Sequence, residues 1–221
     1  MNEIRDLIVG IDFGAKTSQI CYYDRKAAEP VSVPVKLGSS QLEIPNYICK
    51  KAGTTEYVIG LDAEYFAREK GGTLLDHLYE ISRRAEPVQI AEDEKTPGEL
   101  LAIYLKGLLR YLGVMDIVKN TRILTVTTPS LDAQQVRNWS EAFARMGFSR
   151  EKCKLMDYEE SFYYYFFTQK KDLWNRNIAW YSFDGNDVTY RNFEMKNTEK
   201  NVQIRLSEPQ YTVLPVEGPV R

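Results

Sequence analysis

The sequence contains little of what imidazole metal centres, disulfide scaffolds and Ser-His-Asp catalysis require. It has one histidine, His77, and three widely spaced cysteines, Cys21, Cys49 and Cys153. A single histidine next to an aspartate on a polar stretch gives no support to a zinc site or a catalytic triad. An odd number of dispersed cysteines forms neither a zinc pattern nor a disulfide framework, which is typical of a reducing compartment. We therefore expect a cytoplasmic protein.

Long apolar runs and an excess of basic charge are also absent. No run approaches the ~18 apolar residues of a spanning helix. The N-terminus carries acidic residues and only a short apolar run, so it is not a signal peptide. The chain has 29 basic and 31 acidic side chains, a net charge of −2. This balance predicts neither a membrane segment nor a basic face for nucleic acid.

What the chain does contain is enough apolar material for one sizeable core. It has 221 residues, 43% of them hydrophobic, which allows one or two domains. Short apolar or alternating runs predict strands, and 3.6-residue periodicity predicts helices. Residues 86–95 are polar and acidic and predict an exposed loop. The predicted strands are 7–11, 17–23, 30–36, 42–49, 57–59, 121–127, 152–156, 177–183, 188–195 and 202–206, and the predicted helices are 61–70, 73–84, 97–112, 131–146 and one after residue 157.

Three of these helices carry sharper signals. Thr96–Glu99 has an N-cap threonine, a first-turn proline and a capping-box glutamate in register. In the helix over 131–146 the spacing places four apolar residues on one face, Val136, Trp139, Phe143 and Met146. The last helix is aromatic on all sides, so it is either deeply buried or exposes a face for a partner.

The most informative stretch is the first hairpin, Leu7–Asp24. A carboxylate, Asp12, closes its first strand, where it could hold a hydrated divalent cation. Gly14 then lets the backbone turn or approach a ligand closely, and hydroxyls follow at Thr17 and Ser18. Successive turn amides can cradle phosphate oxygens. The other interpretation is an ordinary β-hairpin with an aspartate and a glycine in its turn.

Three segments give the chain a resemblance to a known superfamily. The segment GIDFGAKTS at 10–18 is similar to the first phosphate loop of the heat-shock-chaperone, actin and sugar-kinase ATPases. The segments TVTTP at 125–129 with DAQQ at 132–135, and VIGLDA at 58–63, are similar to further motifs of its chaperone-like branch. The resemblance implies an α/β, ribonuclease-H-like fold, with a mixed sheet and flanking helices.

The resemblance also implies a site for ATP and Mg²⁺. Asp12 would organise the water shell of the metal, and Asp184 would supply a second carboxylate. Asp157 or Glu159 would orient the attacking water. The phosphates would be held by Gly14, Ala15, Lys16, Thr17, Ser18 and Gly185.

The chain departs from the superfamily pattern at places that matter for hydrolysis. The second phosphate loop keeps one glycine, Gly185, and an extra acid, Asp187, sits where phosphate would approach. A carboxylate there repels phosphate unless a cation intervenes. At the position of the chaperone lysine the chain offers Glu64 or Tyr65, and the nearest lysine is Lys70.

These observations predict a first lobe over residues 1–206 with a smaller insertion at about 38–120. Residues 207–221 would form a tail before a second lobe, expected beyond residue 221. Our leading hypothesis is a degenerate, chaperone-like ATPase-fold protein that senses nucleotide or acts as a scaffold for a protein partner. The alternatives are an active Mg-ATPase in a full-length protein and a small-molecule kinase of the same superfamily.

Overall fold

The computed structural model describes residues 6–36, 38–168, 176–184, 187–198, 201–206 and 210–213. It divides the chain into two compact units, Met1–Asp157 and Tyr158–Arg221. The predicted mixed α/β class is confirmed. These units do not test the predicted lobe over residues 1–206, which stays a prediction. Within the described residues, no helix has the length and apolarity needed to cross a membrane.

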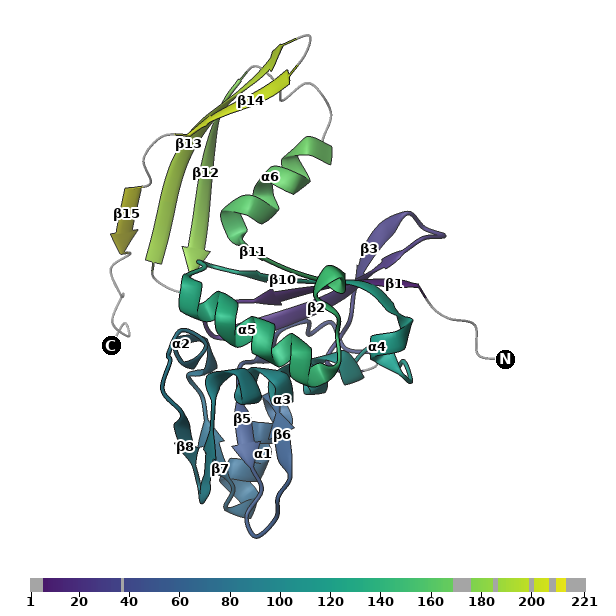
Figure 1. The fold of residues 1–221 in the computed structure, drawn as a ribbon, viewed down its shortest axis with the longest axis vertical. Coiled ribbons are helices and arrows are strands. Elements are labelled where there is room, and N and C mark those ends of the chain that lie inside the picture. Colours follow the sequence, from purple (N-terminus) through teal and green to yellow (C-terminus); the bar gives the residue numbers. More distant parts are fainter. Residues whose placement is uncertain are drawn as a thin grey trace. The chain divides into compact units, whose positions relative to one another are not determined.

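The first unit is built on one mixed sheet with the strand order β3-β2-β1-β10-β11 (Figure 1). The central strand β1 pairs in parallel with β10, which pairs in parallel with β11. On its other side β1 pairs antiparallel with β2, and β2 pairs antiparallel with β3 and with the short β4. The strands are β1 (Leu7–Phe13), β2 (Thr17–Asp24), β3 (Glu29–Ser32), β4 (Ile44–Pro45), β10 (Thr121–Thr128) and β11 (Cys153–Asp157).

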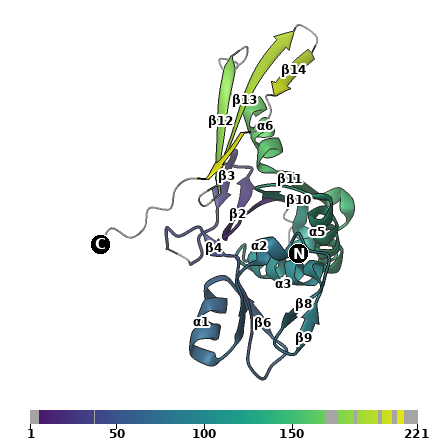
Figure 2. The ribbon, with the colours of Figure 1, turned by 90° about the vertical axis from the view of Figure 1, so that its left-hand side faces the viewer.

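Two long helices pack on one face of this sheet, α3 (Pro97–Arg110) and α5 (Ala133–Met146) (Figures 1 and 2). The core-facing residues of β1 alternate along the strand and are at most 1% exposed, as at Ile11 and Phe13. The Phe13 ring meets Trp139 of α5 edge-on, with centroids 5.1 Å apart, and Tyr104 of α3 at 6.1 Å. Aromatic pairs of this geometry add to the burial of apolar area, so Phe13 joins both helices to the sheet.

The helix ends follow the sequence signals. The capping box at the start of α3 is confirmed, because the Thr96 hydroxyl accepts from the Glu99 amide and the Glu99 carboxylate accepts from the Thr96 amide. Helix α5 begins after its N-cap Asp132 and ends at Gly147, which has a positive φ. The four apolar residues predicted to share one face of α5 are not equally buried, since Trp139 is 0% exposed and Val136 is 40% exposed. The buried residues of α5 are Gln135, Asn138, Trp139, Ala142 and Phe143. An apolar pattern does not include Gln135 and Asn138, which are polar and form hydrogen bonds toward the interior.

Between β3 and α3 the chain forms a smaller part with its own three-stranded sheet. Its order is β6-β5-β7, with helix α1 alongside, and a separate β8–β9 hairpin follows helix α2. Figure 2 shows α1 next to β6. The elements are β5 (Ile48–Lys50), β6 (Tyr57–Ile59), α1 (Gly60–Lys70), β7 (Thr73–Leu75), α2 (Leu78–Ile81), β8 (Val88–Ile90) and β9 (Asp93–Lys95).

Several predictions for this part were wrong. The helix predicted over 73–84 is a strand, in which residues 73–75 pair with β5, followed by one helical turn. The apolar spacing that looked helical arises because both the strand and the turn contribute buried residues. The loop predicted over 86–95 is the β8–β9 hairpin, which buries Ile90 at 1% exposure. The strand predicted over 30–36 ends at Ser32, before Pro34, which has no N–H group to donate to a ladder. The strand predicted over 42–49 is divided into two short strands, β4 and β5.

Two short helices connect the remaining elements of the first unit. Helix α4 (Ile117–Asn120) leads into β10, and the 3₁₀ turn η1 (Arg150–Lys152) leads into β11. Both therefore lie at the amino ends of the parallel strands.

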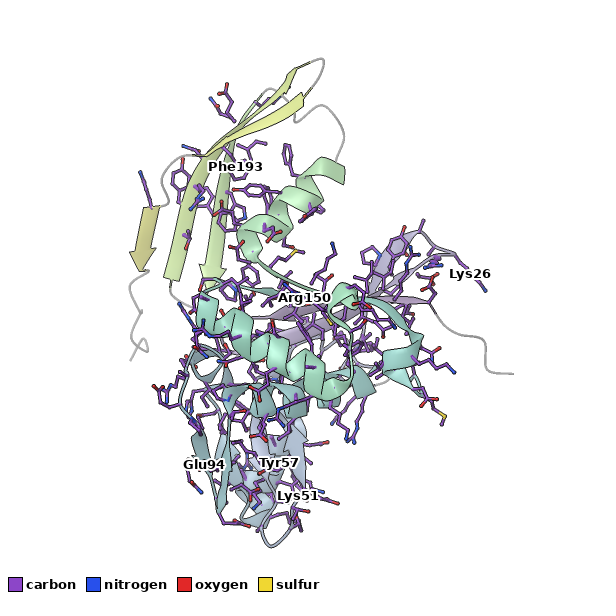
Figure 3. All side chains as sticks on the ribbon, in the orientation of Figure 1. Lys26, Lys51, Tyr57, Glu94, Arg150 and Phe193 are labelled. Atoms are coloured by element: carbon purple, nitrogen blue, oxygen red, sulfur yellow. The ribbon has the colours of Figure 1, made fainter. Side chains whose placement is uncertain are left out.

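The second unit consists of helix α6 and an antiparallel sheet with the order β12-β13-β14, in which β15 also pairs with β13. The predicted hairpin of the second sheet is confirmed. Phe193 of β13 meets Phe162 of α6 with ring centroids 5.3 Å apart, and lies between sheet and helix in Figure 3. Tyr164 and Tyr165 are 58% and 61% exposed, so α6 buries one aromatic face and exposes another. The elements are α6 (Tyr158–Thr168), β12 (Asn177–Asp184), β13 (Asp187–Thr198), β14 (Asn201–Leu206) and β15 (Gln210–Val213).

The packing of α5 on the sheet leads to a stability prediction. Trp139→Ala should lower the free energy of unfolding by about 3–5 kcal/mol, because a fully buried ring is replaced by a cavity. Val136→Ala, on the exposed side of the same helix, should change it by less than about 0.5 kcal/mol. Urea denaturation followed by circular dichroism measures both. Equal losses in the two variants would contradict the packing described for α5.

Candidate functional site

The carboxyl ends of the three parallel strands β1, β10 and β11 lie side by side at one end of the first unit's sheet, which we call its carboxyl edge. Asp12 near the end of β1 is paired with Thr127 of β10, and Thr128 is paired with Asp157 at the end of β11. Two of the predicted catalytic residues, Asp12 and Asp157, are thus brought to the same edge from strands on either side of β10. Ligands of α/β sheets commonly bind outside the carboxyl ends of parallel strands.

The two carboxylates belong to opposite faces of the sheet. Asp12 is exposed and shares its face with its partner Thr127, whose hydroxyl donates to the Ile11 carbonyl at 3.3 Å. Along β11, alternation puts Asp157 on the face of Leu155, which packs against the core. The arrangement leaves Asp12 facing solvent beside the first loop, while Asp157 lies half-buried at the start of α6.

The loop that follows β1 is a tight bend held from below by one buried side chain. The Gly14 amide donates to the Thr17 carbonyl at 3.0 Å, which closes the bend. Asn46 is 0% exposed and forms hydrogen bonds to two residues of the bend. Its side-chain amide donates to the Gly14 carbonyl at 2.6 Å, and its backbone amide donates to the Lys16 carbonyl at 2.9 Å. The bend is therefore pre-formed by the protein itself.

Asn46 is in turn fixed by two hydroxyls. The Ser18 hydroxyl donates to its side-chain oxygen at 2.6 Å, and the Tyr104 hydroxyl of α3 donates to the same oxygen at 2.8 Å. Burial is the main cause that raises the pKa of Tyr104 above its ordinary value, which keeps this hydroxyl a donor. Of the predicted phosphate-binding residues, Ser18 thus directs its side chain inward and supports the loop from beneath.

The outer side of the bend offers free donors. In the described part of the chain, the backbone amides of Ala15 and Lys16 donate to no protein acceptor. The Lys16 side chain is exposed, and Asp12 precedes the bend by two residues. Consecutive unpaired amides in a turn form a concave anion site, and a lysine beside them adds positive charge. This arrangement can accept phosphate oxygens, with Asp12 placed to hold a hydrated cation next to them.

A hollow lies against β2, the strand that follows the bend. It has a volume of about 330 Å³ and is lined by Gln19 and by residues 40–43. Gln19 is the antiparallel partner of Asp12 in the hairpin, so the hollow adjoins the exposed face on which Asp12 lies. Neither Asp12 nor any residue of the bend over 14–16 lines this hollow.

The remaining predicted site residues belong to the second unit. Glu159 accepts from Arg191 at 2.5 Å and also from the Tyr163 hydroxyl, so its carboxylate is already held by two donors. Asp184 ends β12, and only its backbone is among the described atoms; Gly185 lies outside the described residues. Their meeting with Asp12 across a cleft stays a prediction.

Lys50 of β5 is a deeply buried lysine that forms ion pairs with acidic residues. Lys50 is 3% exposed and its ammonium group contacts the carboxylates of Glu92 and, at 3.1 Å, Asp93. The bond to Glu92 is the main cause that raises the pKa of Lys50. Asp93 also accepts from the Tyr57 hydroxyl, and Figure 3 places Tyr57 and Glu94 in this inserted part. Lys50 thus ties the β8–β9 hairpin to β5.

Sequence reasoning missed the residues that support the loop. Asn46 lies between two short apolar strands, and a buried asparagine has no periodic signature. Tyr104 follows Leu101 by three residues, so its place on the buried stripe of α3 was predictable, but its bond to Asn46 spans 58 residues of sequence. Among the described residues, no group of three or more histidine, cysteine or acidic side chains comes together to bind a metal.

Comparison with protein families relates the chain to a known family. A family model described as "Family of unknown function (DUF5716) C-terminal" matches residues 29–218. No curated protein matches the chain.

The support beneath the loop leads to a second prediction. Asn46→Ala should lower the free energy of unfolding by about 1–3 kcal/mol, because it removes the acceptor of two buried hydroxyls. It should also speed hydrogen exchange of the Gly14 amide. Tyr104→Phe keeps the asparagine and should cost less. A double-mutant cycle should give a coupling of about 0.5–3 kcal/mol between the two residues, and a coupling near zero would contradict the network.

Proposed function

The chain belongs to the DUF5716 C-terminal family, and we propose that it senses nucleotide through Mg²⁺ and phosphate bound at the bend after β1. In this proposal the fold is that of the actin-like, chaperone-like ATPases, and the nucleotide state is passed on to a protein partner. The observation that carries it is the pre-formed bend over residues 14–16, beside Asp12 at the carboxyl edge of the sheet, where two backbone amides have no acceptor among the described residues.

The strand order supports the ribonuclease-H-like part of the proposal. Three strands in antiparallel succession, β1 to β3, are followed by two strands that are parallel to β1, with a helix before each of them. The smaller part lies between β3 and α3, and it falls within the insertion that the resemblance implies at about 38–120, although that range also includes α3. An ordinary hairpin has no need of this order or of a buried support beneath its turn.

Metal binding would use few protein ligands. Mg²⁺ keeps several of its waters and commonly takes one or two carboxylates together with substrate phosphates. Asp12 at the exposed end of β1 fits that role, and the proposal needs no cage of acidic residues. Lys16 and the amides of the bend would meet the phosphate charge.

Binding without efficient hydrolysis fits the other contacts better than rapid turnover does. Phosphoryl transfer depends on positioned charges and an oriented water. Glu159, which the resemblance assigns to orienting the water, is already held by contacts with Arg191 and Tyr163, and the position of the chaperone lysine offers Glu64 or Tyr65 instead. These contacts favour a sensor over a hydrolase or a kinase.

A thermal shift experiment tests nucleotide binding. ATP with Mg²⁺ at ten times its dissociation constant should stabilise the chain by about 1.4 kcal/mol, or roughly 3–5 °C in Tm. Asp12→Asn should abolish this rise, because it removes the carboxylate that holds the cation. Glu94→Gln, which removes an exposed carboxylate of the inserted part, should leave it unchanged. An unshifted Tm at millimolar ATP would refute the proposal.

A phosphate-release assay separates a sensor from a hydrolase. At saturating ATP and Mg²⁺ the turnover should stay below about 0.1 s⁻¹, against a median near 10 s⁻¹ for enzymes. A rate in the ordinary enzyme range, lost in Asp12→Asn, would make the chain an ATPase.

A further inference from the structure

A second hollow, with a volume of about 730 Å³, lies at the opposite edge of the same sheet. It is formed by the end of α3, the segment leading into α4, α4 itself, and the residues before β11. We propose that it binds an anionic amphiphile, a molecule with a carboxylate or phosphate head group and an aliphatic body. The volume falls within the range of small-molecule sites.

The charge of the hollow is strongly one-sided. Four of its lining residues are basic, Lys106, Arg110, Lys119 and Lys152, and one is acidic, Asp116. Within the part of the chain that the structure describes, none of the four forms an ion pair with a carboxylate, and Lys152 donates to a backbone carbonyl at 3.2 Å. A chain of net charge −2 thus concentrates unneutralised positive charge at this edge. Such a cluster attracts an anion.

The other lining residues are aliphatic. They include Leu109, which is 1% exposed, together with Val114, Ile117, Val118 and Met146. The lining contains no aromatic side chain on which a base could stack. A flexible hydrocarbon body suits such a surface, and methionine adapts well to it. The combination selects for an amphiphile over a nucleotide or a bare inorganic anion.

The wall of the hollow is held by hydrogen bonds. The chain turns at Gly113 and again at Asp116, a non-glycine residue with φ of 49°. The Asn120 side chain donates to the Met115 carbonyl at 2.9 Å, and the Thr121 hydroxyl donates to the Ile117 carbonyl at 2.7 Å. The aliphatic residues of the wall are therefore presented by an ordered segment, which reduces the entropy lost on binding.

The position makes this site separate from the proposed nucleotide site. Lys119 and Lys152 lie just before the amino ends of β10 and β11, whereas Asp12 is paired with Thr127 near the carboxyl end of β10. Six residues of strand, about 20 Å at ~3.3 Å per residue, separate Thr121 from Thr127. The proposal therefore does not depend on nucleotide binding.

Calorimetric titration of the full chain tests the proposal, with dodecanoate below its micelle-forming concentration as the probe. We expect saturable binding to one site. Dodecanol, which lacks the charge, and inorganic phosphate, which lacks the apolar body, should bind roughly tenfold more weakly or worse. Phosphate binding as tight as that of dodecanoate would overturn the proposal.

Charge-reversal variants assign the binding to this hollow. The double variant Lys106→Glu with Lys119→Glu changes two exposed residues of the lining and should weaken dodecanoate roughly tenfold or more. The single variant Lys119→Gln should weaken it less. Lys26→Glu with Lys36→Glu is the matched control, because it makes the same change in net charge on exposed residues outside the lining; Figure 3 shows Lys26 at the tip of the β2–β3 hairpin. Equal affinity in the two double variants would overturn the assignment.

A vesicle arm distinguishes the source of the amphiphile. The head-group and acyl chemistry is shared by a free fatty acid and by an anionic phospholipid. Co-sedimentation with phosphatidylglycerol vesicles that exceeds that with phosphatidylcholine, and is lost in Lys106→Glu with Lys119→Glu, would indicate a bilayer lipid. Binding of dodecanoate without such co-sedimentation would indicate a free ligand. Failure of both arms overturns the proposal.

Discussion

The arrangement at the carboxyl edge depends on one buried side chain, Asn46. A tight bend after a strand leaves backbone groups that must be satisfied by a partner or by solvent. Asn46 satisfies those on the inner side, at Gly14 and Lys16, and is itself fixed by hydroxyls from β2 and α3. The amides of Ala15 and Lys16, on the other side of the bend, donate to no acceptor within the part of the chain that the structure describes. A protein that only needed to reverse its chain would have no use for this support.

The same contacts link the loop to the core of the first unit. Tyr104 reaches Asn46 from α3 while its ring lies 6.1 Å from that of Phe13, the residue that directly follows Asp12. Phe13 in turn packs against Trp139 of α5. The exposed carboxylate of Asp12 therefore directly precedes Phe13, whose ring packs against both α3 and α5. Packing of this kind holds a site residue within the narrow geometric tolerance that ligand recognition requires.

Much of this fold could be predicted from local patterns, and the failures have identifiable causes. Periodicity gave β1, β2, β10, α3 and α5, because each has a strong apolar signal and marked ends. It failed over 73–84, because the buried residues Leu75, Leu78 and Ile81 belong to a strand and to a single helical turn. It also failed over 86–95, because the acidic segment that looked like a loop is a hairpin whose charge Lys50 neutralises. For the site, Asp12 and the bend were predictable from residue order. Asn46 was not, because its bonds span 28 to 58 residues of sequence.

The two edges of the sheet also show why an averaged charge says little about binding. A net charge of −2 argues against a basic face over the whole molecule. The parallel strands β10 and β11 nevertheless begin beside lysines, whereas Asp12 is the penultimate residue of β1 and Asp157 ends β11. An anion can meet the amino edge directly. At the carboxyl edge a phosphate is repelled by Asp12 unless a divalent cation lies between them. The two proposed sites would therefore follow opposite electrostatic rules, and the proposed dependence on Mg²⁺ concerns the carboxyl edge alone.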